Sequence, residues 1–223
     1  MVDAATQRTN MVESQVLTSD VTDRRILRAM RELPRERFVP ANLAELAYMD
    51  EAVPITAAGA GKDRRWLLSP RVLAKLLQLA EIGENDRVLD VGCGTGYSAA
   101  VLGKIARSVV ALECGVALAE EARKTLAGLA LDDVSVALGD LRAGCVSQAP
   151  YDAIILQGSV AGSPDELLDQ LKDGGRLVAV VRQGGLGKAT IWRRLGRSLD
   201  QWTAFDAAAP PLPGFESVPA FVL

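Results

Sequence analysis

The sequence contains no histidine among its 223 residues. This absence excludes Ser-His-Asp and Cys-His nucleophilic catalysis, and it removes the commonest metal ligand. Cysteine is scarce as well, because Cys93, Cys114 and Cys145 are odd in number and lack Cys-x-x-Cys spacing. Such cysteines fit a reducing compartment better than a disulfide framework, so we expect a cytoplasmic protein without a metal site.

Long apolar runs and an excess of positive charge are also missing. No stretch approaches the roughly 18 consecutive apolar residues of a membrane span. Residues 1–10 lack the apolar core of a signal peptide. The 25 lysines and arginines are balanced by 28 acidic residues, for a net charge of −3. A nucleic-acid binder usually needs a basic face, so we expect neither nucleic acid nor membrane as a partner.

What is present is an alternation of amphipathic helices and short apolar strands. Runs of Val, Ile and Leu predict strands at Arg87–Val91, Ser108–Leu112, Val134–Leu138, Ala153–Leu156 and Arg176–Val181. Helical spacing predicts helices at Pro70–Leu79, Ser98–Ile105, Leu118–Ala130 and Glu166–Leu171. This alternation is typical of an α/β, doubly wound, mostly parallel sheet covered on both faces. Two further strands, Lys188–Arg193 and Pro219–Leu223, are expected to pair antiparallel at its edge.

The first part of the chain has a different pattern. Apolar residues at near-helical spacing from Asn10 to Met30 predict helices that restart at Thr22-Asp23, and a short helix is expected at Ala41–Ala47. Residues 50–69 are rich in glycine, proline and charge, which is typical of a loop over a site. Ser69 is the expected N-cap of the helix that begins at Pro70.

The most informative segment is Val-Leu-Asp-Val-Gly-Cys-Gly-Thr-Gly, residues 88–96. An apolar run ends at Asp90-Val91 and breaks into a loop with three glycines, as where a backbone approaches a ligand. Glu113 ends the next apolar run, about 20 residues on, where a βαβ unit places a carboxylate beside a bound ribose. The dipeptide Gly139-Asp140 follows the third strand. These features predict a nucleotide-like cofactor.

Electrostatics narrow the choice of cofactor. The sequence lacks the G-x-x-x-x-G-K-[ST] pattern of a P-loop, and its glycines do not follow the G-x-G-x-x-G order of dinucleotide sites. Asp90 would repel a pyrophosphate but suits an ammonium or sulfonium group. S-adenosylmethionine has both groups, together with a ribose diol for Glu113 and an adenine amine for Asp140. The residues therefore favour S-adenosylmethionine over NAD.

Residues 88–96 resemble motif I of the class I methyltransferases, and longer segments resemble the protein-L-isoaspartate O-methyltransferase family. The matching segments include Met11–Gln15, Leu33–Pro40, Val53–Ile55, Gly94–Leu102, Ala149–Ile155 and Gln170–Val178. The resemblance implies a Rossmann-like seven-stranded class I methyltransferase sheet with added N-terminal helices. It also implies methyl transfer from S-adenosylmethionine to a carboxylate on a protein or peptide, with S-adenosylhomocysteine as the product. Residues 1–80 would then form the N-terminal helices and lid, and residues 81–223 the cofactor-binding core, in one structural domain.

The expected cofactor contacts follow from this assignment. Asp90 would face the sulfonium, Glu113 would bind the ribose, and Asp140 with Leu141 would frame the adenine. The remaining predicted contacts are Gly92, Cys93, Gly94, Thr95, Gly96, Cys114 and Gln157. A carboxylate with a pKa of about 4 is already ionised at neutral pH, so it needs no general base to accept a methyl group.

The segment 66–70 departs from the family pattern. The family has a Thr-Ile-Ser-Gln-Pro-like segment that closes over the cofactor and the isoaspartyl group, whereas this chain has Trp-Leu-Leu-Ser-Pro. Leu68 then stands at the serine position, and Ser69 becomes the candidate catalytic residue through a shift of one residue. The predicted substrate contacts are Leu68, Ser69 and Arg65. Arg64, Arg65 and Arg71 could hold a substrate carboxylate, although a solvated charge run is an equal interpretation.

A second departure follows the fourth strand, where Leu-Gln-Gly-Ser at 156–159 replaces a Val-Thr-Ala-Ala-like stretch. These changes leave two alternatives to an isoaspartyl methyltransferase. One is a paralogue with a different methyl acceptor, and the other is a protein that binds the cofactor without transferring its methyl group. The sequence predicts no oligomeric state.

Overall fold

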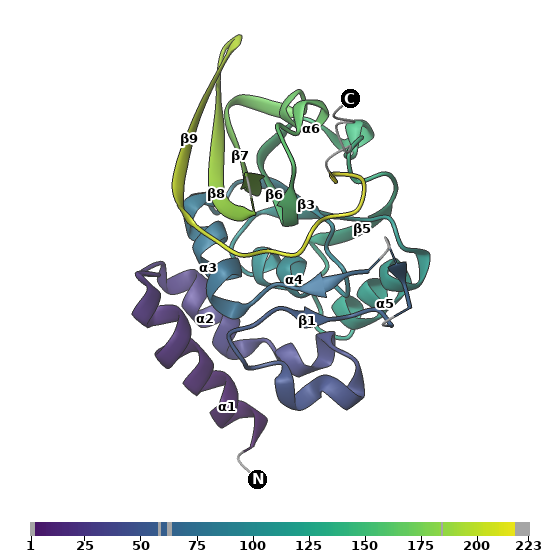
Figure 1. Ribbon diagram of the computed structural model, residues 1–223. Helices are drawn as coiled ribbons and strands as arrows, with labels where there is room; N and C mark the ends of the chain where they lie inside the picture. Colours follow the sequence, from purple (N-terminus) through teal and green to yellow (C-terminus); the bar gives the residue numbers. More distant parts are fainter. Residues whose placement is uncertain (1–2, 58, 62–63, 184, 217–223) are drawn as a thin grey trace, which may run out of the picture.

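A twisted seven-stranded sheet forms the centre of the molecule (Figure 1). The structure is a computed structural model that describes residues 3–57, 59–61, 64–183 and 185–216. The sheet has the order β5-β4-β3-β6-β7-β8-β9. Its strands are β3 (Arg87–Val91), β4 (Ser108–Glu113), β5 (Val134–Leu138), β6 (Tyr151–Val160), β7 (Leu171–Gln183), β8 (Leu186–Leu195) and β9 (Ser198–Asp206). The strands β3 to β7 run parallel to one another, which confirms the predicted α/β architecture.

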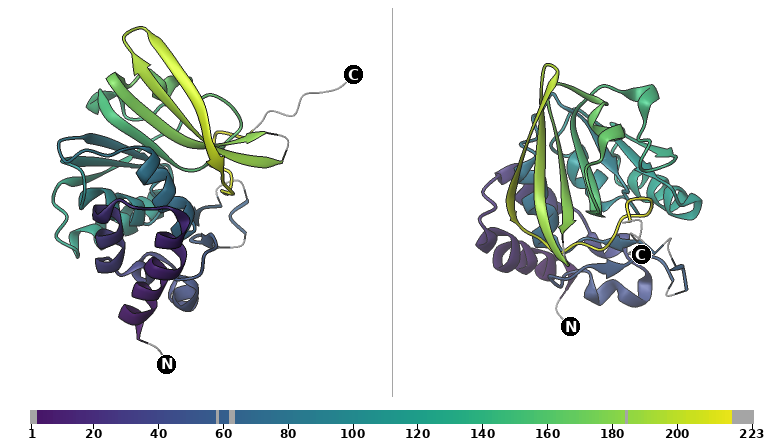
Figure 2. Two further views of the ribbon diagram at one scale, coloured as in Figure 1. Left: turned by 90° about the vertical axis from the view of Figure 1, so that its left-hand side faces the viewer. Right: turned by 45° about the horizontal axis from the view of Figure 1, so that its top comes forward.

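The antiparallel edge differs from the prediction. β8 pairs antiparallel with β7 as expected, but its outer neighbour is β9, which follows after a tight turn. Figure 2 shows β8 and β9 as a long hairpin along one side of the sheet. The sequence gives little sign of β9 because nearly all its side chains are exposed, so no apolar alternation marks it. The expected strand Pro219–Leu223 lies outside the described residues.

Helices cover the two faces of the sheet unequally. On one face, α3 (Pro70–Leu79), α4 (Tyr97–Gly103) and α5 (Val116–Ala127) share a hydrophobic cluster with the N-terminal helices α1 (Ala4–Met11) and α2 (Arg24–Glu32). The other face carries the four-residue helix α6 (Asp165–Leu168). The predicted helix Glu166–Leu171 is thus shorter than expected, because Leu171 already begins β7. None of the described helices is both long and apolar enough to cross a bilayer.

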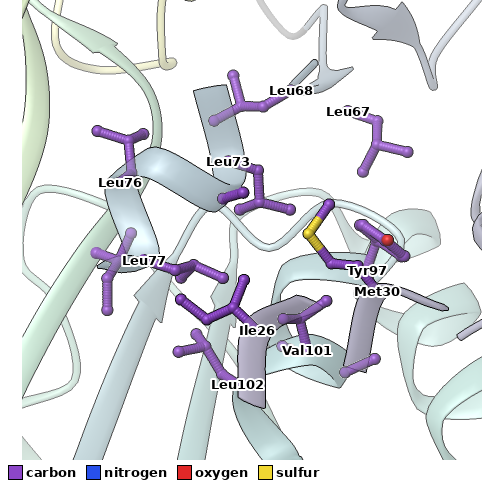
Figure 3. Packing of buried hydrophobic residues seen from close by; sticks show 14 of the residues in the cluster. Ile26, Met30, Leu67, Leu68, Leu73, Leu76, Leu77, Tyr97, Val101 and Leu102 are labelled. Carbon is purple, nitrogen blue, oxygen red and sulfur yellow. The ribbon is translucent and has the colours of Figure 1, made fainter. Parts of the chain in front are cut away.

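The N-terminal helices are built into the core rather than attached to its surface. Asp23 caps α2 by accepting a hydrogen bond from the backbone N–H of Arg25 at 2.8 Å. Figure 3 shows Ile26 and Met30 of α2 packed against Leu73 of α3 and Val101 of α4. The predicted helix at Ala41–Ala47 is a 3₁₀ segment, Ala41–Leu46.

Residues 50–69 are more ordered than their composition predicts. They contain a two-stranded antiparallel ribbon of β1 (Val53–Pro54) and β2 (Trp66–Leu67). The backbone N–H of Ile55 extends this pairing by donating to the carbonyl of Arg65 at 3.0 Å. Strands of two residues leave no detectable periodicity in a sequence. The ribbon fixes where Arg65 stands relative to the sheet.

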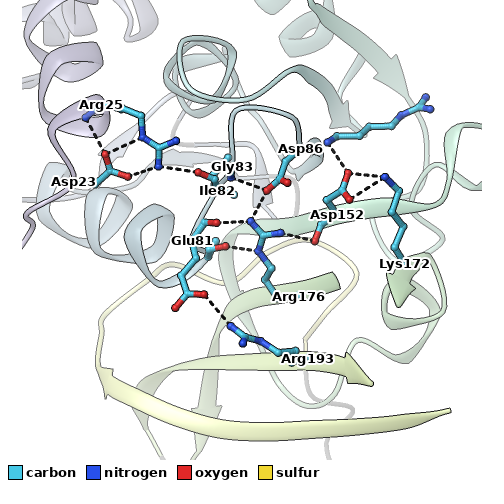
Figure 4. A network of polar contacts seen from close by, with 12 residues as sticks. Asp23, Arg25, Glu81, Ile82, Gly83, Asp86, Asp152, Lys172, Arg176 and Arg193 are labelled. Carbon is cyan, nitrogen blue, oxygen red and sulfur yellow. Dashed lines mark hydrogen bonds and ion pairs between the residues drawn. The ribbon is translucent and has the colours of Figure 1, made fainter. Parts of the chain in front are cut away.

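A buried arginine joins the loop between α3 and β3 to the sheet (Figure 4). Arg176 of β7 donates hydrogen bonds to the carbonyl oxygens of Ala80, Glu81 and Asp152, and it forms an ion pair with Asp86. The carboxylate of Asp86 also accepts from the backbone N–H of Gly83 at 2.7 Å. This network sets the point at which β3 begins, and therefore the position of the glycine loop at its other end.

Candidate functional site

The glycine loop follows β3 at the carboxyl edge of the parallel strands. Gly92, Gly94 and Gly96 all have positive φ, at 78°, 58° and 97°. At Gly92 the neighbours are so close that an added Cβ would lie 2.7 Å from Leu212 Cδ1 and 2.8 Å from Arg65 Nη2. At Gly94 an added Cβ would clash with the side chain of Ile55. The positive φ therefore favours glycine at these positions, and the side chains of Leu212, Arg65 and Ile55 occupy the space that a Cβ would need.

Asp90 lies under this loop and is fully buried. Its Oδ2 accepts a hydrogen bond from Ser98 Oγ, and its Oδ1 accepts one from Gln157 Nε2, both at 2.6 Å. Burial raises the pKa of Asp90 to about 7, against the lowering effect of the two hydrogen bonds. Gln157 therefore belongs to the predicted site through its hydrogen bond to Asp90. The sequence did not reveal the role of Ser98.

The neighbouring carboxylate, Glu113 at the end of β4, is also fully buried. Its Oε1 accepts hydrogen bonds from the backbone N–H groups of Cys114 and Gly115, at 2.9 and 3.1 Å. Its Oε2 accepts one from the N–H of Gly94 at 2.8 Å. Glu113 thereby joins the ends of β3 and β4, which confirms that the two predicted acids meet at one edge.

Arg65 completes this arrangement from the lid segment. Its Nη1 lies 2.8 Å from Glu113 Oε1, and its Nη2 donates to the carbonyl oxygen of Gly92 at 2.6 Å. Both members of the ion pair are almost wholly excluded from solvent. Arg65 was predicted to contact substrate, but the structure places its guanidinium on the carboxylate expected to bind the cofactor. The reason is the β1–β2 ribbon, which brings residue 65 over the glycine loop.

The segment after β9 also lies over the glycine loop, as Arg65 does. Figure 1 shows this segment, in yellow, crossing the molecule to the carboxyl edge of the sheet. Leu212 is buried there, in contact distance of Gly92 and Gly158. The backbone of Ser159 donates to Pro210 O at 2.8 Å and accepts from Leu212 N at 2.9 Å. No sequence pattern connects Leu212 with the glycine loop, so this part of the site could not be predicted.

The third predicted group of cofactor contacts lies beside β5. Gly139 donates its N–H to the carbonyl oxygen of Glu113 at 3.0 Å, which places Asp140 next to the end of β4. The Asp140 side chain is exposed and accepts from the N–H of Arg142 at 2.8 Å. Leu141 is buried beneath it. These positions agree with one continuous edge formed by Asp90, Glu113 and Asp140.

Three further predicted residues have mainly structural contacts. Cys93 is buried, and burial raises the pKa of its thiol well above the usual range, so the thiol stays protonated. Thr95 is buried and donates its hydroxyl hydrogen to the carbonyl oxygen of Phe38 at 2.6 Å. Cys114 is exposed, and its backbone N–H donates a hydrogen bond to Glu113 Oε1.

The predicted substrate contacts Leu68 and Ser69 do not meet this edge as expected. Leu68 belongs to the hydrophobic core (Figure 3), and its carbonyl oxygen accepts a hydrogen bond from buried Arg35 at 2.6 Å. Its side chain therefore cannot present itself to a substrate. Ser69 Oγ accepts from the N–H of Val72 at 3.4 Å, which confirms the predicted N-cap of α3. The bond uses Ser69 Oγ as an acceptor, and Ser69 also lines a pocket of about 500 Å³ with Asp50 and Arg71, away from the glycine loop residues.

The chemistry of this edge fits S-adenosylmethionine. Glu113 supplies acceptors for a diol, Asp90 supplies negative charge beneath the loop, and the glycines leave no Cβ between backbone and ligand. Arg65 and Leu212 lie over the same atoms, so both side chains must move aside for a ligand to reach Glu113.

The titration of Asp90 gives a prediction for stability. Because its pKa is raised from 3.8 to about 7, the folded protein retains a proton that the unfolded chain has already lost. The contribution of Asp90 to the free energy of unfolding should therefore decrease as pH rises from about 4 to about 7 and then stay constant. Urea unfolding of the wild type and of Asp90→Asn across this range isolates the effect. A difference between the two proteins that does not vary with pH would contradict it.

A family model and individual relatives of this chain point to the same family. Residues 6–201 match the model of the family described as protein-L-isoaspartate(D-aspartate) O-methyltransferase. A protein-L-isoaspartate O-methyltransferase of Methanoculleus marisnigri is 41% identical over 175 residues, covering 78% of this chain and 77% of the relative. One of Methylorubrum extorquens is 41% identical over 204 residues, covering 92% of this chain and 86% of the relative.

Solved structures are similar in fold. A protein-L-isoaspartate O-methyltransferase structure superposes with a TM-score of 0.80 at 24% identity, covering 93% of this chain and 66% of that one. A Plasmodium falciparum beta-aspartate methyltransferase, solved in complex with S-adenosyl-L-homocysteine, superposes with a TM-score of 0.74 at 18% identity. That match covers 91% of this chain and 96% of the other.

Proposed function

Since the chain belongs to the protein-L-isoaspartate(D-aspartate) O-methyltransferase family, we propose that it methylates the free carboxylate of isoaspartyl residues in proteins and peptides, with S-adenosylmethionine as the donor. The observation that carries the proposal is the presence of two buried carboxylates at the glycine loop. Asp90 lies beneath the loop, and Glu113 accepts a hydrogen bond from the N–H of Gly94 within it. The bound cofactor supplies an electrophilic methyl group on a sulfonium.

The site residues have distinct roles in this proposal. Glu113 binds the ribose hydroxyls once Arg65 has moved away from its Oε1. Asp90, held by Ser98 and Gln157, has a pKa of about 7 in the ligand-free protein, and a sulfonium or ammonium group beside it would favour its charged form. Asp140 and Leu141 frame the adenine. No residue acts as a general base, because an isoaspartyl carboxylate is already ionised at neutral pH. The protein's contribution is to hold the acceptor oxygen in line with the methyl group.

The acceptor is the part of the proposal that needs a direct test. Two peptides of one sequence, one with an L-isoaspartyl residue and one with aspartate, are offered to the enzyme with methyl-labelled S-adenosylmethionine. We expect base-labile methyl ester on the isoaspartyl peptide with at least about tenfold preference, since the site must hydrogen-bond a carboxylate at one position. Glu113→Ala is the negative control.

A different outcome would identify one of the two alternatives. Tight binding of S-adenosylhomocysteine without ester above a no-enzyme control would mean that the acceptor is not isoaspartate. The burial of Leu68 is the observation that favours this alternative, because the position at which the family has a serine holds an apolar side chain packed in the core.

A further inference from the structure

Two buried hydroxyls near the cofactor edge have no hydrogen-bond partner among the described residues: that of Tyr97, whose ring lies under the Arg35 guanidinium, and that of Ser159, which lines a pocket. Ser159 is 1% exposed, and its Oγ has no hydrogen-bond partner in the part of the chain that the structure describes. Buried polar groups are nearly always paired, so an unpaired one needs an explanation. Ser159 lines a pocket of about 300 Å³ that Arg182, Pro211 and Phe215 also line.

The backbone fixes Ser159 at the carboxyl edge of the sheet. Leu156 of β6 is level with Val91, the last residue of β3, so residues 157–160 extend past the start of the glycine loop. Ser159 pairs with Val180 of β7 on one side and forms an isolated bridge with Pro211 on the other. Its position is therefore set from both sides.

A positive charge faces the same pocket. Arg182 lies two residues beyond Val180 on β7, so its side chain leaves the sheet on the same face as that of Ser159. Arg182 is exposed and forms no ion pair within the described residues. Glu216 also lines the pocket, where its Oε2 accepts from the N–H of Gly214 at 2.9 Å, so the pocket holds one acidic side chain beside Arg182. A guanidinium and a free hydroxyl together match a carboxylate ligand.

The pocket adjoins the cofactor edge. Gln157, whose Nε2 donates to Asp90 Oδ1 at 2.6 Å, lies two residues before Ser159 on β6. Side chains two residues apart on a strand leave the same face, so Ser159 lies just beyond the residue that holds Asp90. Leu68 has no hydroxyl, and Ser69 lines a different pocket, so neither residue supplies a hydroxyl here.

We propose that Ser159 and Arg182 form the subsite that binds the acceptor carboxylate. This assignment rests on the proposed function and names the residues that hold its substrate. Ser159 Oγ donates to one carboxylate oxygen, and Arg182 attracts the same group. The other oxygen stays free to form a bond with the methyl carbon while the carbon–sulfur bond breaks. The electron pair of that bond remains on sulfur, and no proton is transferred.

Ser159→Ala tests the subsite with little risk to folding, because the hydroxyl it removes has no partner in the protein. We expect the KM for the isoaspartyl peptide to rise about tenfold, the usual effect of losing one hydrogen bond to a charged group. Arg182→Ala should raise it as well. The affinity for S-adenosylhomocysteine should stay within about twofold in both variants.

The matched control is Ser163→Ala. Ser163 is an exposed serine on the same connection, and its hydroxyl bonds to Asp165 Oδ1 at 2.6 Å rather than facing this pocket. Its removal should leave the KM unchanged. An unchanged KM in Ser159→Ala, or a parallel loss of S-adenosylhomocysteine affinity, would overturn the proposal.

Direct peptide binding separates this proposal from the proposed function. Calorimetry compares the isoaspartyl peptide with a peptide of the same sequence that has asparagine in its place. If the wild type makes no ester, the proposed function fails, but a preference for the carboxylate that Ser159→Ala and Arg182→Ala reduce still supports the subsite. Equal binding of both peptides by the wild type would reject the subsite.

Discussion

Replacing Glu113 with alanine is expected to weaken S-adenosylhomocysteine binding at least about 100-fold. A carboxylate that accepts two hydroxyl groups makes charge-assisted hydrogen bonds, each about 1.5–3 kcal/mol, and about 1.4 kcal/mol corresponds to a factor of ten in affinity. The variant also leaves Arg65 buried over Gly92 without its partner, because the two residues form an ion pair of 2.8 Å. Isothermal titration calorimetry measures the affinity directly.

Arg65→Ala is the matched variant, because it breaks the same ion pair from the other side. Glu113 then keeps its three backbone donors, from Gly94, Cys114 and Gly115, and its Oε1 no longer has a competing guanidinium. Binding should be at least as tight as in the wild type. If Glu113→Ala binds normally, the ribose assignment is wrong. If Arg65→Ala loses affinity to the same degree, Arg65 helps to bind the cofactor and does not compete with it.

Replacing Arg176 with alanine is expected to lower the free energy of unfolding by about 3–5 kcal/mol, the usual result of removing one partner from a buried ion pair. Arg176 is 9% exposed, and its loss removes a donor from three carbonyl oxygens and leaves the Asp86 carboxylate with the N–H of Gly83 but without its ion pair. For a domain of this size the melting temperature should fall by about 10 °C. Differential scanning calorimetry and urea unfolding measure the two quantities.

Lys172→Ala is the control from the same network (Figure 4). Lys172 pairs with Asp152 at 2.7 Å, but its side chain is 41% exposed, so the change should cost no more than about 1 kcal/mol. Equal losses in both variants would show that the burial of Arg176 is not what makes the network stabilising.

The buried centre of the fold could be predicted from the sequence, but its exposed and very short elements could not. β3 has the predicted bounds because a mostly apolar, buried run is flanked by turns, and the edge strand β5 has them because Val134, Val136 and Leu138 alternate with Ser and Ala. β9 was missed because an exposed edge strand has no apolar face to detect. β6 extends beyond Leu156 through Gln157, Gly158 and Ser159, since pairing with β7 and the final segment overrides their weak strand propensity.

The candidate site shows the same division. Asp90 and Glu113 were predicted because they lie at the ends of two apolar runs, and the ends of parallel strands meet at one edge of the sheet. The three glycines were predicted because they follow the first of these runs. The partnership of Arg65 with Glu113 joins residues 48 positions apart. Leu212 meets Gly92 from still farther along the chain. Such contacts depend on tertiary packing, so no local pattern reveals them. Ser69 caps α3 as predicted, and its assignment to catalysis stays a prediction.

The side chain of Leu212 lies against Gly92, so we expect ligand binding at the glycine loop to include the cost of displacing the segment that carries it. Three backbone hydrogen bonds hold this segment to the end of β6: Ser159 to Pro210, Leu212 to Ser159 and Ala161 to Phe215. A ligand that reaches only the open form has an apparent affinity reduced by the fraction of molecules that are open. A measured dissociation constant is then a product of two terms, the intrinsic affinity of the edge and the population of its open form. Substitutions at Pro210 or Phe215 can therefore change cofactor affinity without touching Asp90 or Glu113.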